Sequence, residues 1–79
     1  MSASLILTLS CEDKPGIVSR VTSNLFEAGA NIREAQQFDD PLSSKFFMRV
    51  VFDPGAGSVD QFRAAFTPVA QQFSMEWNL

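Results

Sequence analysis

Two segments of the chain alternate hydrophobic and polar side chains with the period of a β-strand. Because successive side chains of a strand point to opposite faces, this alternation predicts strands at residues 4–11 and 45–53, each with one buried face. The second segment also carries Phe47 and Val51 on its other face, so that face is only partly polar. The predicted buried positions are Leu5, Leu7, Leu9, Cys11, Phe46, Met48, Val50 and Phe52.

Hydrophobic residues recur at helical spacing in two further segments, which predicts helices at residues 15–28 and 58–72. For the first helix, Asp13 is suited to cap the start, Pro15 to lie in the first turn and Gly29 to end it. The apolar stripes of the two helices consist of Ile17, Val21, Leu25, Ala28, Val59, Phe62, Phe66 and Val69.

The second predicted helix has a clear start and an interruption. Ser58 is followed three residues later by Gln61, which is the pattern of a capping box. Pro68 lies inside the helical segment. Because a proline ring crowds the carbonyl four residues before it, we expect a kink or a split of this helix near Ala64.

Two shorter segments complete the predicted elements. Residues 31–39 favour a strand whose pattern is poor, since polar residues separate Ile32 from Phe38, which has the same parity. A β-bulge or an exposed strand would explain this pattern. Residues 73–79 alternate cleanly and predict a last strand.

The order of these segments is that of the α+β ferredoxin-like βαββαβ sandwich, an antiparallel sheet with two helices on one face. A chain of 79 residues is short enough for one domain only, spanning residues 1–79. A domain of this size buries only roughly 60% of its unfolded surface, so we expect self-association to add stability. We expect the eight phenylalanines to lie in the core, because their rings have no polar tip.

Composition and charge exclude several classes of function. The net charge is −3 and the chain has no basic stripe, which argues against a nucleic-acid partner. No apolar stretch approaches the length of a membrane crossing, and the first residues lack the positive charge of a secretory signal, so we expect a cytoplasmic protein without a membrane partner. Cys11 is the single cysteine and is expected to be a buried thiol.

The residues that usually carry catalysis are missing. The chain has no histidine, one cysteine cannot build a thiolate metal site, and no glycine-rich phosphate loop occurs. The neighbouring Asp39 and Asp40 are interpreted as part of a solvated turn. We therefore expect no catalytic residues, no metal and no cofactor in this chain.

The strongest candidate for a binding site is the junction from Asp13 to Val18. It places the unpaired N–H groups of a helix start at a surface loop, and Gly16 allows a ligand carboxylate to approach the backbone. The alternative is an ordinary capped turn. A second candidate is Asn31 beside Ile32, since asparagine offers both a donor and an acceptor; its alternative is a simple helix-to-strand turn.

These residues carry a resemblance to a known family. The stretch Leu7–Val18, with the sequence LTLSCEDKPGIV, and the later Gly29–Ile32 resemble the start of an ACT domain. The resemblance implies a βαββαβ fold, pairing of copies through sheets or helices, and an amino acid bound between copies. Its carboxylate would meet the backbone near Gly16 and its amino group the Asn31 side chain. The implied ligand set, whose last two residues come from a second copy, is Asp13, Lys14, Pro15, Gly16, Ile17, Val18, Asn31 and Ile32.

Three further stretches, Ala35–Phe38, Lys45–Val50 and Met75–Trp77, resemble the formyltetrahydrofolate deformylase family. This resemblance implies a parent enzyme that hydrolyses its folate substrate to tetrahydrofolate and formate for purine synthesis. The parent's catalytic domain is not among these 79 residues. We therefore expect a regulatory domain that senses a small amino acid such as glycine or methionine and forms a homodimer. A ligand-free pairing domain and the sensor part of an ACT-type regulator of glycine metabolism remain alternatives.

Overall fold

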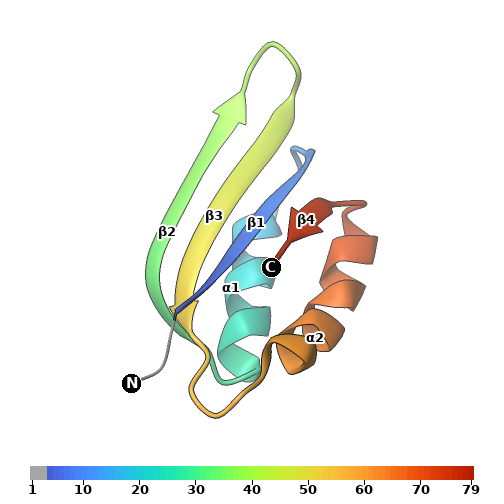
Figure 1. Cartoon of the computed structure of the whole chain (residues 1–79). Coiled ribbons are helices and arrows are strands. Elements are labelled where there is room, and N and C mark those ends of the chain that lie inside the picture. Colours follow the sequence, from blue (N-terminus) through green and yellow to red (C-terminus); the bar gives the residue numbers. More distant parts are fainter. Residues whose placement is uncertain (1–3) are drawn as a thin grey trace.

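The computed structural model describes residues 4–79, and their elements follow the predicted order. They are β1 (Leu5–Glu12), α1 (Ile17–Glu27), β2 (Asn31–Asp40), β3 (Lys45–Asp53), α2 (Val59–Gln72) and β4 (Glu76–Asn78). The strands form one antiparallel sheet in the order β2-β3-β1-β4, and both helices cover the same face of it (Figure 1). The ferredoxin-like fold is therefore confirmed, while the first three residues of the predicted domain 1–79 lie outside the described part.

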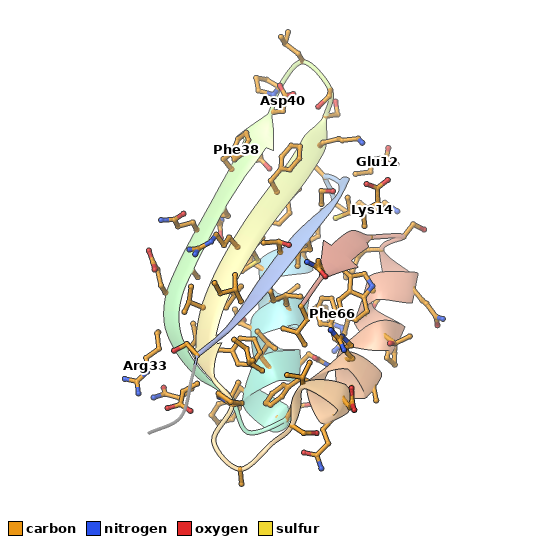
Figure 2. All side chains as sticks on the ribbon, in the orientation of Figure 1. Glu12, Lys14, Arg33, Phe38, Asp40 and Phe66 are labelled. Carbon is orange, nitrogen blue, oxygen red and sulfur yellow. The ribbon has the colours of Figure 1, made fainter. Side chains whose placement is uncertain are left out.

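The hydrophobic core fills the layer between the sheet and the helices. β1 and β3 pair so that Leu7 lies opposite Val50 and Leu9 opposite Met48, as the alternation of the sequence predicts. Stripes of α1 and α2 cover these side chains, and Figure 2 shows Phe66 of α2 in this layer. The buried hydrophobic residues are Leu7, Leu9, Cys11, Ile17, Val21, Leu25, Ala30, Phe46, Met48, Val50, Phe52, Phe62, Phe66, Val69, Ala70 and Phe73.

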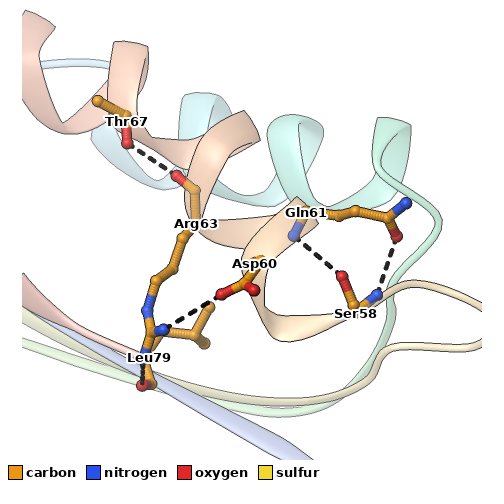
Figure 3. A network of polar contacts seen from close by, with 6 residues as sticks. All are labelled: Ser58, Asp60, Gln61, Arg63, Thr67 and Leu79. Atoms are coloured by element: carbon orange, nitrogen blue, oxygen red, sulfur yellow. Dashed lines mark hydrogen bonds and ion pairs between the residues drawn. The ribbon is translucent and has the colours of Figure 1, made fainter.

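Helix α2 begins with the predicted capping box. The Ser58 hydroxyl accepts a hydrogen bond from the Gln61 N–H at 3.2 Å, and the Gln61 side chain accepts one from the Ser58 N–H at 2.9 Å (Figure 3). One turn later, an Arg63 guanidinium nitrogen donates to the backbone oxygen of Leu79 at 3.2 Å. Helix α2 therefore has hydrogen-bond partners for the N–H groups of Ser58 and Gln61 at its start, and it also contacts Leu79.

The predicted split of α2 near Ala64 is wrong, since the helix continues from Val59 through Pro68 to Gln72. Buried residues on both sides of the proline, Phe66 and Val69 among them, pack this helix against the sheet. Ala64 is exposed, so water can bind the carbonyl that Pro68 leaves without a backbone donor. Tertiary packing thus outweighs the local cost of the proline.

The last strand is shorter than the predicted range 73–79, because its first residues end α2 instead. Ser74 has a left-handed backbone with φ +52°, and the N–H of Met75 donates to the Ala70 carbonyl at 2.9 Å. A left-handed residue followed by a bond of this kind is the Schellman motif that closes helix ends. β4 can therefore start only at Glu76.

Strand β2 contains the predicted bulge. Its register with β3 shifts between Ile32 and Glu34, so the side chains after Arg33 change face. Phe38 consequently lies on the opposite face from Ile32 and is 61% exposed. Phe26 on α1 is also 76% exposed, and Phe47 is half-buried on the face of β3 that points away from the helices, outside the core. The prediction that all eight phenylalanines lie in the core is therefore wrong for these three.

Gly57, in the loop before α2, lies against a core ring, which makes it sensitive to substitution. A Cβ atom at this position would lie 2.7 Å from Cε2 of Phe62, whose side chain is buried. We expect Gly57→Ala to lower the free energy of unfolding by about 1–3 kcal/mol, as overpacking of a core does. Urea denaturation measures this change, and the exposed neighbour Ala56→Ser is the control, expected to stay within about 0.5 kcal/mol. Equal stability of the two variants would contradict the prediction.

Candidate functional site

The corner between β1 and α1 is open to solvent. Helix α1 begins at Ile17 and its N-cap is Gly16, which has φ +87° and ψ 1°. No side chain of residues 4–79 caps this helix start, so the prediction of an Asp13 cap is wrong. Pro15 precedes the helix rather than lying in its first turn, because the left-handed Gly16 separates them. The first turn of α1, which follows the exposed Gly16, therefore keeps N–H groups for an external acceptor.

A hollow of about 520 Å³ lies in front of this corner. It brings together five of the eight residues in the predicted ligand set. Pro15 is exposed in the same corner without lining the hollow. Both signs of charge meet here, since carboxylates and a lysine ammonium surround the helix start. The lining residues are Asp13, Lys14, Gly16, Ile17, Val18, Ser19, Gln37, Asp39 and Phe46.

The other two residues of the ligand set, Asn31 and Ile32, lie elsewhere in the same chain. They begin β2, whereas the hollow lies near its end at Asp39. At about 3.3 Å per residue, eight residues of strand separate these positions by roughly 26 Å. Figure 2 shows Lys14 near the hairpin end of the sheet and Arg33 at the opposite end. One copy alone therefore does not assemble the predicted set.

Sequence reasoning missed two polar residues of the hollow, Gln37 and Asp39. They lie opposite Met48 and Phe46 of β3, on the face that the helices cover. The bulge after Ile32 places them there, because it reverses which side chains of β2 face inward. The signal in the sequence was the poor alternation of this strand, which indicated a bulge without giving its position.

The hairpin between β2 and β3 supports the corner. The N–H of Asp13 donates to the Ser44 carbonyl at 3.0 Å, which links the end of β1 to the hairpin turn. Asp40 holds that turn, since its carboxylate accepts hydrogen bonds from the Leu42 N–H at 3.1 Å and the Ser43 hydroxyl at 2.9 Å. Asp39 and Asp40, predicted to belong to a solvated turn, instead end strand β2, and the exposed turn of residues 41–44 that follows is held in place by Asp40.

The hydroxyl of Ser43, followed by the N–H of Leu42, holds the pKa of Asp40 below its ordinary value. A carboxyl with a lowered pKa stabilises the fold above its unfolded pKa, and this contribution is lost as the pH falls through the lowered value. We expect Ser43→Ala to move the pKa of Asp40 up towards the ordinary value, measured by NMR titration of its side-chain carboxyl. An unchanged Asp40 titration in the variant would contradict this prediction.

Cys11 is a free cysteine buried beneath the corner. Burial, followed by the negative charge of Asp13, raises the pKa of its thiol, while Lys14 lowers it. The thiol therefore stays protonated near neutral pH, as expected for a buried cysteine. Within residues 4–79, no group of three or more histidine, cysteine or acidic side chains could hold a metal ion. In the same part of the chain, neither helix combines the length and apolar character that a membrane crossing requires.

Comparison with known proteins agrees with the fold. The family model of the ACT domain matches residues 5–66, which include both helix starts and the whole corner. The chain belongs to the ACT domain family. An ACT domain protein from Streptococcus pneumoniae has the same fold, with a TM-score of 0.81 and 25% identity over 99% of this chain and 88% of that one.

Among individual proteins, this ACT domain is similar to formyltetrahydrofolate deformylases. It is 46% identical over 76 residues to the formyltetrahydrofolate deformylase of Bacillus subtilis, covering 92% of this chain and 25% of that protein. The crystal structure of a formyltetrahydrofolate deformylase from Pseudomonas syringae has a TM-score of 0.90 and 39% identity, covering 95% of this chain and 26% of that one. This ACT domain thus spans about a quarter of the length of the relatives it matches, and it corresponds to their N-terminal domain.

Proposed function

We propose that this ACT domain senses a small amino acid and regulates a formyltetrahydrofolate deformylase in the cytoplasm. The parent enzyme would hydrolyse formyltetrahydrofolate to tetrahydrofolate and formate, which supplies purine synthesis. The similarity to deformylases over nearly the whole chain supports this parent. The observation that carries the sensing role is the open hollow at Gly16, where an uncapped helix start faces solvent.

The chemistry of the hollow suits the two charges of a free amino acid. The positive end of α1, at Ile17 and Val18, favours a carboxylate. Lys14 adds a positive charge on the same side, while Asp39 on β2 offers a negative charge to an ammonium group. Because the lining of the hollow also includes the apolar side chain of Phe46, a glycine or methionine side chain suits it better than a charged one.

A second copy would complete the site. In the sheet of residues 4–79, β2 is an edge strand, so one row of its backbone groups is available for pairing. If two β2 strands pair antiparallel about their midpoints, the Asn31 end of each lies against the Asp40 end of the other. Asn31 and Ile32 of one copy then lie beside the hollow of the other. This arrangement supports the proposal that these two residues act across a homodimer.

Calorimetric titration of the 79-residue chain with glycine, methionine and serine tests the sensing role. We expect saturable heat with at least one of them. Asn31→Ala should weaken that binding, whereas the control Asn78→Ala, on the exposed side of β4, should leave it unchanged. Absence of heat with all three at millimolar concentration would favour the ligand-free pairing domain instead.

A further inference from the structure

The face of the sheet that no helix covers carries an exposed hydrophobic surface. We call it the outer face and define it by the outward side chains of β1 and β3. Ile6 is 44% exposed, and Val51 and Phe47 are half-buried. Phe38 of β2 extends this surface, since its ring stacks on Phe47 with centroids 5.0 Å apart and planes 12° apart. Solvent-facing rings and aliphatic side chains in one patch are typical of an interface.

The registers of the strands show that large side chains of the outer face lie beside small ones. Phe47 of β3 is paired with Ser10 of β1, and Arg49 is paired with Thr8. Two hollows follow from this difference in size. One of about 360 Å³ is lined by Ser10, Thr8 and Phe47 together with Glu76, and one of about 450 Å³ is lined by Thr8, Phe47, Phe38 and Arg49.

The remaining pairs of the outer face are matched in polarity and charge. Val51 of β3 is paired with Ile6 of β1, and Lys45 is paired with Glu12. β3 therefore presents a ring, a guanidinium, an aliphatic side chain and an ammonium. At the positions paired with these side chains, in the same order, β1 presents two small hydroxyl side chains, an aliphatic side chain and a carboxylate. Each strand carries what the other would need as a facing partner.

We propose that the outer face is an interface between two copies of this chain, related by a two-fold axis that runs along the strands between β1 and β3. Such an axis places β3 of one copy over β1 of the other. Phe47 then enters the hollow over the second copy's Ser10, Val51 packs on its Ile6, and Lys45 meets its Glu12. Sheets packed about 10 Å apart leave room for such interdigitation. An isologous contact of this kind makes every pair twice.

This interface differs from the pairing invoked for the ligand site. The ligand pairing uses the edge of β2 and the hollow on the helix side, whereas the present one uses the opposite face of the sheet. Either can exist without the other. If both exist, two edge-paired dimers stack into a tetramer.

A mixing experiment tests the facing of Val51 and Ile6. Val51→Asp and Ile6→Lys each place a charge against a hydrophobic side chain of the second copy. By sedimentation velocity, we therefore expect each variant alone to be a species with half the mass of the assembly that the unsubstituted chain forms. In a mixture of the two variants, the introduced aspartate faces the introduced lysine in one pair, and the other pair keeps the native contact. We therefore expect the mixture to recover the full mass as a one-to-one complex. Circular dichroism verifies that both variants remain folded.

Three outcomes would overturn the proposal. The unsubstituted chain could be a monomer, which would leave the outer face for a different protein surface. The folded variants could retain the full mass, which would place any assembly at the β2 edge alone. The mixture could stay at half mass, which would show that Val51 and Ile6 do not face each other. Amino-acid binding is measured separately, by calorimetry, so the absence of this interface would not contradict the proposed amino-acid site.

Discussion

Replacing Phe52 by alanine is expected to remove a large part of this domain's stability at 25 °C. Phe52 is fully buried at the centre of the core, and its ring lies 5.0 Å from that of Phe62 on α2, centroid to centroid. Removal of a buried ring costs about 3–5 kcal/mol, through lost burial and the cavity that remains. A chain of 79 residues has a total stability of only about 4–12 kcal/mol. Far-ultraviolet circular dichroism and urea denaturation measure the loss.

A phenylalanine outside the core provides the matched control. Phe26→Ala makes the same chemical change on α1, where the side chain is 76% exposed. We expect it to change the free energy of unfolding by no more than about 0.5 kcal/mol. Similar losses for both variants would mean that the ring at Phe52 does not hold the sheet and α2 together.

The central strands could be predicted from the sequence because their side chains alternate over the whole pairing length. Leu7, Leu9, Val50 and Phe52 are buried, and a strict alternation leaves no second way to bury them. The bounds of the last strand were harder to predict. The last strand was predicted too long because a serine, Ser74, adopts the left-handed backbone that glycine usually supplies at a helix end.

The candidate site was predictable on one side only. The side formed by the β1–α1 corner is local in sequence, so Gly16 and its neighbours indicated a helix start at a surface loop directly, although the Asp13 cap predicted there does not form. The side formed by β2 depends on the bulge after Ile32, which turns Gln37 and Asp39 towards the hollow. A periodicity argument assumes an uninterrupted strand and assigns these residues to the other face. The proposed role of Asn31 and Ile32 depends on a second chain, which no pattern within one sequence can place.

The openness of the corner follows from what surrounds it. Ile17 is buried in the core and fixes the helix start, while Gly16 immediately before it is exposed with no atom within 4 Å of a Cβ at its position. The rigid helix and the free space therefore meet at one peptide. This arrangement allows ligand binding to be blocked by a single side chain without disturbing the core.

Gly16→Leu is accordingly expected to abolish the amino-acid heat while leaving the mass of the assembly unchanged. The leucine side chain would enter the space in front of the α1 N–H groups, which a ligand carboxylate would otherwise occupy. The left-handed φ of +87° adds a strain of about 1–2 kcal/mol, which lowers stability without moving the sheet. We expect affinity for the best of glycine, methionine and serine to fall by at least about tenfold, equivalent to about 1.4 kcal/mol.

Gly55→Leu is the control that separates the effect of backbone strain from the effect of a side chain blocking the hollow. Gly55 also has a left-handed backbone, with φ +61°, and a Cβ there would make only an ordinary contact of 3.4 Å to the Gly29 carbonyl oxygen. It lies in the loop between β3 and α2, away from the residues that line the hollow. We expect this variant to lose similar stability yet to keep the amino-acid heat. Loss of the binding heat in both variants would mean that backbone strain alone abolishes binding. Retained heat in Gly16→Leu would exclude the corner as the ligand site, because a leucine there must displace anything bound against the helix start.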